Sequence, residues 1–137
     1  MRRKLSTETK EYPQNSETRG KIMANNYAPV KDPANIEPYF FVLCDLKRGT
    51  NVSGDNGELQ GATISTITSV TATTGLNVDS SNKNAVTIDG ISYGVDTVVT
   101  AWLSGGTAGT EYTVTCKVTT SDSRTLEYSM IVPVEHL

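Results

Sequence analysis

The sequence has few of the side chains on which catalysis and metal binding usually depend. Its 137 residues include one histidine and two cysteines. The histidine, His136, is the last residue but one, where few neighbours are present to orient its ring for a catalytic triad or a zinc site. The aspartates and glutamates show no spacing typical of a calcium-binding loop. We therefore predict no catalytic residue, no metal site, no cofactor and no enzymatic activity.

Long apolar runs are also missing. No run approaches the roughly 20 residues of a membrane span. The basic start of the chain, residues 1–4, is not followed by an apolar stretch. The sequence thus predicts neither a secretory signal nor a membrane anchor.

Basic residues are scarce outside the N-terminal region. Residues 1–35 carry seven basic and four acidic side chains, which leaves five basic and eleven acidic ones for the rest of the chain, a net charge of −6. A domain of this charge repels a phosphate backbone, so we expect no binding to nucleic acid.

Serine and threonine, in contrast, are abundant. The chain has 32 of them, and 27 lie between Thr50 and Ser129. Threonine is β-branched, so it fits a strand well and loses side-chain freedom in a helix. This composition favours an all-β fold.

Apolar segments of strand length recur after residue 38. In residues 112–119 the apolar and polar side chains alternate at every position, as in a strand with one buried face. A short polar turn at 121–123 joins this strand to the next, which predicts an antiparallel hairpin. The strands that we expect are 39–46, 62–71, 76–79, 85–88, 95–103, 112–119 and 125–134. About seven short strands are typical of an immunoglobulin-like antiparallel β-sandwich, which we predict for residues 39–137.

Some residues are expected to shape this sandwich. Tyr112 opens the penultimate strand, where a tyrosine of immunoglobulin-like folds makes a corner hydrogen bond; a plain core position is the alternative. Gly105, Gly106 and Gly109 form a turn that lacks the lysine and the helix of a phosphate-binding loop, so we assign them a structural role. Trp102, the only tryptophan, is predicted to pack in the core, with an exposed position at a partner interface as the alternative.

The two cysteines, Cys44 and Cys116, lie in predicted strands. In antibody domains a cysteine pair bridges the two sheets, but there the second cysteine follows the corner tyrosine by two residues, where this chain has Val114. We predict two buried free thiols, with a disulfide as the alternative.

The N-terminal region, residues 1–38, differs in composition from the rest. Pro29, Pro33 and Pro38 keep the chain extended, because proline fixes φ and biases the preceding residue away from the helical region. We expect an extended lead-in that lies along a surface. Residues 1–26 contain few apolar side chains, so we expect a flexible or partner-ordered arm there.

Several motifs resemble those of a known family. The turn Leu103–Tyr112 reads Leu-Ser-Gly-Gly-Thr-Ala-Gly-Thr-Glu-Tyr. The other motifs are Asp32-Pro33, Gly75-Leu76-Asn77-Val78 and Ser123-Arg124 in the last hairpin. Over roughly residues 28–134 the chain resembles small structural proteins of tailed bacteriophages, the fibre-tail adaptor proteins.

The resemblance implies a non-enzymatic virion protein that joins tail or baseplate to tail fibres. Such a protein is assembled in the bacterial host cytoplasm, which keeps thiols reduced, and contacts other virion proteins in several symmetric copies. Two alternatives stay open: a capsid decoration protein, and a carbohydrate-binding β-sandwich that uses exposed Tyr93 and Trp102.

The surface that meets the partner is harder to predict. The loop Lys47–Glu58 is longer than we expect for the family, and loops of a sandwich often carry recognition. The residues that we expect at partner contacts are Pro29, Pro33, Pro38, Tyr93, Trp102 and Arg48.

Overall fold

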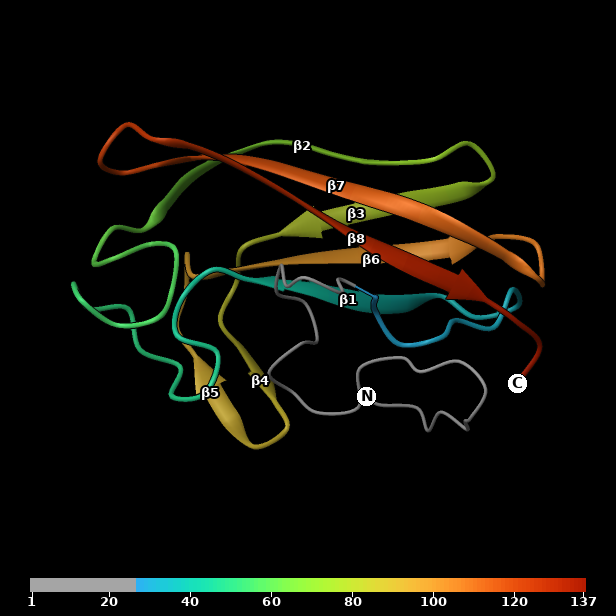
Figure 1. Cartoon of the computed structure of the whole chain (residues 1–137), viewed down its shortest axis with the longest axis horizontal. Helices are drawn as coiled ribbons and strands as arrows, with labels where there is room; N and C mark the ends of the chain where they lie inside the picture. The colour runs from blue at the N-terminus through green and yellow to red at the C-terminus, as the bar shows by residue number, and fades with distance from the viewer. Residues whose placement is uncertain (1–26) are drawn as a thin grey trace.

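Eight strands account for the regular structure of residues 27–137, the part of the chain that the computed structural model describes. The strands are β1 (Glu37–Val42), β2 (Ile64–Ala72), β3 (Leu76–Asn82), β4 (Val86–Ile88), β5 (Ile91–Tyr93), β6 (Val98–Gly105), β7 (Thr110–Thr120) and β8 (Thr125–Val134). They pair antiparallel in three sheets, ordered β1-β6-β3, β2-β7-β8 and β4-β5 (Figure 1). Within residues 27–137 the structure has no helix that is long and apolar enough to cross a membrane. The all-β prediction is confirmed.

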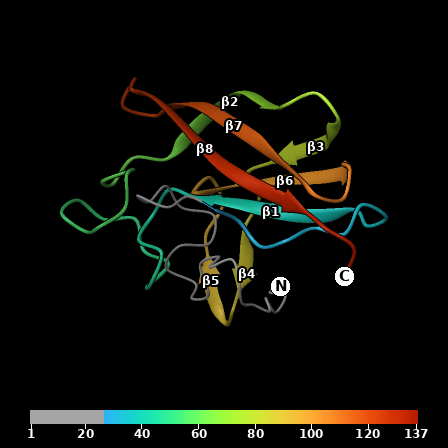
Figure 2. The ribbon, with the colours of Figure 1, turned by 45° about the vertical axis from the view of Figure 1, so that its right-hand side comes forward.

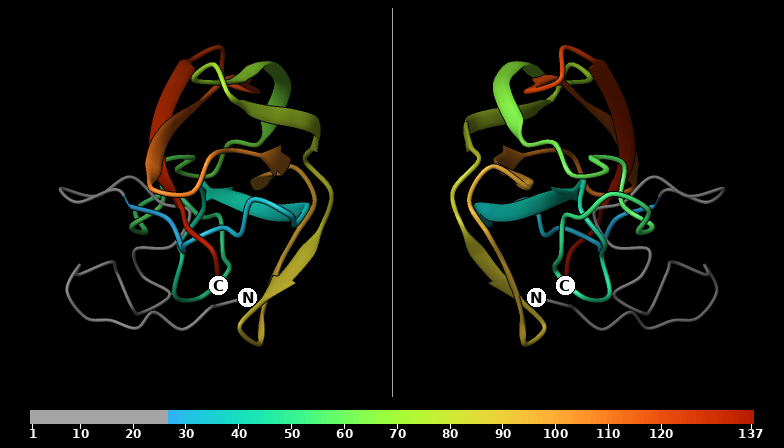
Figure 3. Two further views of the ribbon diagram at one scale, coloured as in Figure 1. Left: turned by 90° about the vertical axis from the view of Figure 1, so that its right-hand side faces the viewer. Right: turned by 90° about the vertical axis from the view of Figure 1, so that its left-hand side faces the viewer.

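The two three-stranded sheets lie one over the other and share a core (Figure 2). Phe41, Val99 and Leu103 from β1 and β6 pack in the same buried cluster as Val114 and Val132 from β7 and β8. Their side chains are at most 1% exposed. The β4-β5 hairpin projects away from the two layers, as the end-on views show (Figure 3).

The hairpin formed by β7 and β8 follows the alternation of the sequence. Val114 and Cys116 are buried, whereas Thr113 between Tyr112 and Val114 is exposed. The register pairs Thr119 with Thr125 across the predicted turn. Both strands and their connection are therefore confirmed.

Other strand predictions need correction. Seven strands were expected and eight are present, because Ile91–Tyr93 forms β5. Three residues are too few to show a period of two, so this strand gave no signal. The turn before it was expected: Asp89 and Gly90 have φ values of 53° and 82°, the positive values that this hairpin turn requires. The first predicted strand, 39–46, begins and ends earlier, since β1 covers Glu37–Val42.

Residues 27–31 lie along the outer edge of β8. Tyr27 and Lys31 form parallel bridges with Ile131 and Val134, and the Lys31 N–H donates to the Pro133 carbonyl at 2.9 Å. Pro133 of β8 is buried beside this segment. The extended lead-in does lie along a surface, that of its own chain. The predicted arm at residues 1–26 lies outside the described residues.

The connection between β6 and β7 contains the corner predicted at Tyr112. Its hydroxyl accepts a hydrogen bond from the Thr107 backbone N–H at 2.9 Å, which confirms the corner bond. Gly105 and Gly106 have φ values of 81° and 97°. A Cβ on Gly106 would lie 2.8 Å from a methyl group of Val134, so the turn requires glycine there.

Cys44 and Cys116 are free thiols, and both are buried. The prediction is confirmed and the disulfide alternative is excluded. Burial raises the pKa of both thiols, that of Cys116 to about 12.

Candidate functional site

The outer face of the sheet β1-β6-β3 brings together residues that are far apart in the sequence. The register places Pro38 of β1 opposite Trp102 of β6, and Phe40 opposite Thr100. Residues that are directly opposite in an antiparallel pair point to the same side of the sheet. Because Leu103 next to Trp102 points into the core, Trp102 and Pro38 point outward.

This outer face is apolar and partly uncovered. Trp102 is 37% exposed, so the prediction of a core position for it is wrong. Pro38 and Phe40 are half-buried beside it. Ile36, directly before β1 and two residues before Pro38, is 62% exposed. We call Ile36, Pro38, Phe40 and Trp102 the apolar face.

A small polar border follows the apolar face on β3. Ser80 lies opposite Trp102 in the register. Nearby, the Ser104 hydroxyl donates a hydrogen bond to the Asp79 carboxylate at 2.8 Å. A partner that covers Trp102 therefore meets a carboxylate at the edge of the contact.

The lead-in before β1 contacts the sheet, but Pro29 and Pro33 are not part of the apolar face. The Pro29 carbonyl accepts a hydrogen bond from the Tyr39 hydroxyl at 2.9 Å, and Tyr39 points into the core from β1. Pro33 is half-buried in the turn between the lead-in and β1. Of the three predicted prolines, only Pro38 joins Trp102.

Lys31 ties the lead-in to the β6–β7 connection. Its side chain is buried, and its Nζ donates to the carbonyls of Asp32 and Gly105, both at 2.9 Å. Burial of the ammonium group lowers the pKa of Lys31, although Glu37 nearby acts in the opposite direction. Lys31 thus holds the segment before β1 in place.

Tyr93, expected at a partner contact, is in the core instead. It is 2% exposed, and its hydroxyl donates to the Leu46 backbone carbonyl. The short strand β5 turns its ring inward toward the loop after β1. Tyr93 therefore offers no exposed aromatic surface to a partner or to a glycan.

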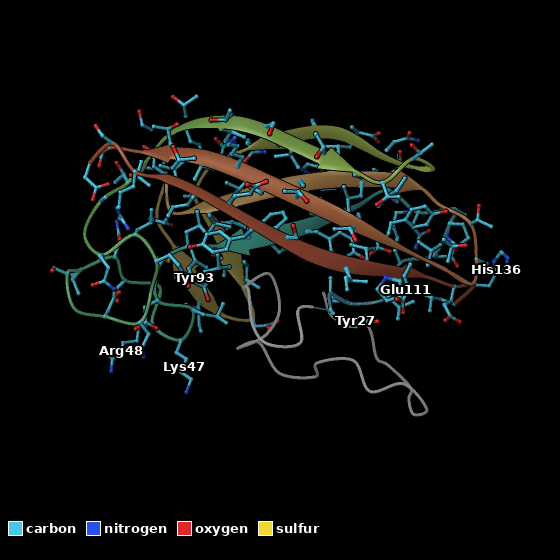
Figure 4. The ribbon with its side chains drawn as sticks, turned by 45° about the horizontal axis from the view of Figure 1, so that its top comes forward. Tyr27, Lys47, Arg48, Tyr93, Glu111 and His136 are labelled. Atoms are coloured by element: carbon cyan, nitrogen blue, oxygen red, sulfur yellow. The ribbon has the colours of Figure 1, made fainter. Side chains whose placement is uncertain are left out.

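Arg48 lies at the opposite end of the molecule from the C-terminus, in the loop after β1 (Figure 4). It is exposed, as is the neighbouring Lys47. The structure therefore separates Pro38 and Trp102, which lie on the apolar face, from Arg48 in the loop after β1.

Two residues of the apolar face were missed by the sequence reading. Phe40 lies in a continuous apolar run, in which no polar position marks an outer face. Ile36 precedes the predicted strand. The sequence held one signal for both residues: alternate residues of an extended chain, such as 36, 38 and 40, point to the same side.

The described residues offer little for catalysis. No three side chains of histidine, cysteine, aspartate or glutamate come together as metal ligands within residues 27–137. His136 is exposed near the C-terminus, where the neighbouring Leu137 N–H donates to Asp32 at 3.0 Å.

Comparison with known proteins decides the family. A family model described as "Podophage GP4 fiber-tail adaptor protein gp77" matches residues 52–133, which is more than half of the chain. This chain belongs to the podophage fibre-tail adaptor family. The adaptor is thus a structural component of the phage virion and not an enzyme. No curated protein and no solved structure matches it.

The range matched by the family model contains only part of the apolar face of the adaptor. Trp102 and the corner at Tyr112 lie inside the matched range, whereas Pro38, Phe40 and Arg48 precede it. The family match therefore covers β2 through nearly all of β8 and leaves out β1.

Proposed function

We propose that the adaptor binds one of its virion partners through the apolar face. The exposed Trp102 opposite Pro38 is the observation that carries this proposal. Tryptophan is enriched among the residues that dominate binding energy at protein interfaces. A partly exposed tryptophan with Pro38 opposite and Phe40 on the same side of β1 is costly in water, and a partner that covers it removes this cost.

The occupant that we propose is a tail or fibre subunit with apolar side chains at the centre of its contact and a basic side chain beside them. The basic side chain would pair with Asp79 at the border of the apolar face. A second copy of the same face fits less well, because Asp79 would approach its own equivalent. The described residues also carry six basic and twelve acidic side chains, so at this face a partner with a basic side chain is favoured over a second copy of the acidic domain.

The immunoglobulin-like prediction stays a proposal, and the sheet order supports it. If β1, β2, β3, β6, β7 and β8 correspond to strands B, C, D, E, F and G, the two sheets have the immunoglobulin orders B-E-D and C-F-G. The β4-β5 hairpin is then an insertion between D and E. The corner bond of Tyr112 to the backbone upstream of strand F is a second supporting observation.

We also propose that residues 1–26 form an arm that contacts another virion subunit, as the sequence suggested. They carry six basic and three acidic side chains, opposite in sign to the acidic domain. Several symmetric copies of the adaptor would place each arm next to an acidic neighbour. The domain, predicted to begin at residue 39, then also includes the lead-in, whose Tyr27 and Lys31 form bridges with β8.

Reconstitution of the virion tests the role of the apolar face. Adaptor-free tails and purified fibre protein of the same phage are each titrated with the full-length adaptor. We expect Trp102→Ala to weaken binding to one of the two by about 10-fold or more. Thr113→Ala, a truncation on the exposed face of the other sheet, is the matched control and should change affinity by less than about twofold. Equal affinities for the wild type and Trp102→Ala would contradict the proposal.

The alternatives have lost support. A glycan-binding sandwich relied on Tyr93 and Trp102 as an exposed pair, but Tyr93 is buried. Capsid decoration disagrees with the description of the family, which names the tail and its fibres.

A further inference from the structure

The connection between β1 and β2, residues 43–63, is the longest one between strands in the described part of the chain. It lies at the end of the molecule opposite the C-terminus (Figure 1). It contains the dipeptide Asn56-Gly57, in which Asn56 is exposed and Gly57 is buried. In a flexible chain an asparagine before glycine loses its side-chain amide readily, because glycine has no Cβ to hinder its own backbone nitrogen. The loop thus contains a chemically labile dipeptide.

The reaction that threatens Asn56 uses the backbone nitrogen of Gly57. This nitrogen gives up its proton and attacks Cγ of the Asn56 side chain, so that a C–N bond forms and ammonia leaves. Water then opens the resulting succinimide ring at either carbonyl, and the products are aspartate and isoaspartate. The reaction needs water alone as co-reactant. Its rate therefore depends on how freely the Gly57 nitrogen approaches Asn56.

Both backbone polar groups of Gly57 are held in hydrogen bonds. Its N–H donates to the Asp55 carboxylate at 2.8 Å, and its carbonyl accepts from the Gln60 side-chain amide at 2.6 Å. The same amide also donates to the Asp55 carbonyl at 2.6 Å. The Gly57 nitrogen cannot turn toward Asn56 unless its bond to Asp55 breaks.

The groups that hold Gly57 are themselves well placed. The N–H groups of Val52 and Gly57 lower the pKa of Asp55, so this carboxylate stays charged at neutral pH. A charged acceptor makes a stronger hydrogen bond than a neutral one. The Gln60 side-chain oxygen accepts from the Gly54 N–H at 2.7 Å, which orients the amide toward Gly57.

Gly57 also has no room to move. A Cβ at this position would lie 2.4 Å from the Cys44 carbonyl carbon and 2.6 Å from the Asp45 nitrogen, so its backbone lies directly against the segment after β1. Two residues further, Leu59 is fully buried, and its N–H donates to the Leu43 carbonyl at 3.0 Å. Reaction at Asn56 therefore requires this part of the loop to open.

The tip of the β4-β5 hairpin offers the opposite surroundings. Asp89 and Gly90 are both exposed, and a Cβ built on Gly90 would have no further atom within 4 Å in the described part of the chain. The hairpin projects away from the two sheets (Figure 3). The molecule thus contains one dipeptide ending in glycine that is packed and one that is open.

We infer that Asn56-Gly57 is a latent deamidation site, which in the folded adaptor reacts only when the loop opens, and that Asp55 and Gln60 are the residues that keep it closed. The inference does not depend on the apolar face. The product carries a new carboxylate between Asp55 and Glu58, so reaction makes the loop less able to close again. A virion protein is not replaced once the particle is assembled, so such a change accumulates.

The variant Asp89→Asn gives an internal reference in the full-length adaptor. It places a second asparagine-glycine dipeptide at the open hairpin tip, and this pair suits the turn, so the fold should be retained. The protein is kept at pH 7.5 and 37 °C, and aspartate and isoaspartate at both positions are followed by mass spectrometry of its peptides. We expect position 89 to react at least about 10-fold faster than Asn56. Equal rates in the folded protein overturn the inference.

The same measurement in concentrated urea shows whether the fold causes the difference. Once the chain is unfolded, the two positions should react at rates within about threefold of each other, because neither is packed. A difference as large as in the folded protein would come from the neighbouring residues in the sequence, and the inference would be wrong.

The roles of Asp55 and Gln60 are tested by truncation. Asp55→Ala removes the acceptor of the Gly57 N–H, and we expect deamidation of Asn56 to become about 10-fold faster or more. Gln60→Ala should accelerate it by a smaller factor. Asp79→Ala, which removes a carboxylate from β3, is the control and should leave the rate within about twofold. An unchanged rate in Asp55→Ala contradicts the role of this carboxylate.

A measurement on the wild type provides a test that needs no variant to fold. Below the unfolding transition, increasing urea promotes local opening, so hydrogen exchange of the Gly57 N–H and deamidation of Asn56 should accelerate by the same factor. Exchange that accelerates while deamidation stays constant would show that Asn56 reacts in the closed loop, and this result overturns the inference.

Discussion

The two three-stranded sheets have similar inner faces and different outer ones. The inner faces of both sheets bury aliphatic and aromatic side chains in one core. The outer face of β2-β7-β8 carries hydroxyl groups: Thr115 and Ser129 are hydrogen-bonded at 2.8 Å, and Thr68 and Thr119 contact at 3.5 Å. The outer face of β1-β6-β3 carries Trp102 and Phe40 instead.

The difference shows which face is suited to water and which to a partner. Hydroxyl groups on a strand satisfy one another or water, so the threonine-rich face needs no cover. An apolar patch has no such partners and is rare on a protein that remains alone. The serine and threonine content of the chain therefore marks the face that needs no partner, and the apolar face is where assembly gains free energy.

The largest effect on stability is expected from a comparison of Leu103 and Trp102, adjacent residues of β6 that point to opposite sides of the sheet. Leu103 is fully buried, so Leu103→Ala should lower the free energy of unfolding by about 2–5 kcal/mol. Trp102→Ala should lower it by less and weaken partner binding, because part of the ring is already exposed. Urea unfolding followed by circular dichroism measures the first effect. A larger stability loss for Trp102→Ala would place that ring in the core after all.

The second prediction concerns Cys116, which points into the core from β7 between the outward-facing Thr115 and Lys117. The pKa of the Cys116 thiol is raised from 9.0 to about 12, so the folded protein keeps a proton that the unfolded chain releases above pH 9. Stability from this group is complete below pH 9 and is lost as pH rises, by about 2 kcal/mol near pH 10.5. Unfolding at several pH values measures the slope, which Cys116→Ala should reduce. An unchanged slope would show that the thiol titrates normally.

The third prediction concerns the bond that joins the two sheets at their corner. Tyr112→Phe leaves the Thr107 N–H without its acceptor and should cost about 1 kcal/mol. Tyr128→Phe removes a hydroxyl from the same hairpin without touching this bond and serves as the control. Urea midpoints of the two variants give the comparison. If both variants unfold at the same urea concentration, the corner bond contributes nothing measurable.

The smallest effect is expected on the hydroxyl face. Lys117 lies opposite Glu127 on β7 and β8, so Lys117→Glu places two like charges together. We expect a loss of stability below about 1 kcal/mol, measured by thermal unfolding at low and high salt. Added salt should reduce the loss. A loss of several kcal/mol would mean that this face is less tolerant than the apolar one.

The sequence predicted those parts of the fold that depend on local pattern. The alternation in β7, the hairpin to β8 and the corner at Tyr112 are all confirmed, because each follows from a few consecutive residues. The free thiols were also predicted, from the spacing of Cys116 to the tyrosine. The strand β5 and the inward position of Tyr93 were not, since three residues carry no period.

The partner surfaces were predicted only in part. Pro38, Trp102 and Arg48 were named as contact residues, and all three are at least partly exposed. Nothing in the sequence indicated that Pro38 and Trp102 are neighbours, because 63 residues separate them and the register alone brings them together. Pro29 and Pro33 were also expected to meet a partner; both are half-buried in a lead-in that packs on its own chain, and their contact with a partner stays a prediction.

The sequence by itself determined the all-β class, the family and the outward direction of threonines 113, 115 and 119, because strand pattern and short motifs are local properties. The tertiary structure decided that β6 lies between β1 and β3, which turns Trp102 outward beside Pro38. It also decided that Arg124 and Tyr93 hold the loop with Arg48, since side chains distant in sequence meet only when the sheets pack. Local pattern specifies which side of a strand is buried, and packing specifies what the other side meets.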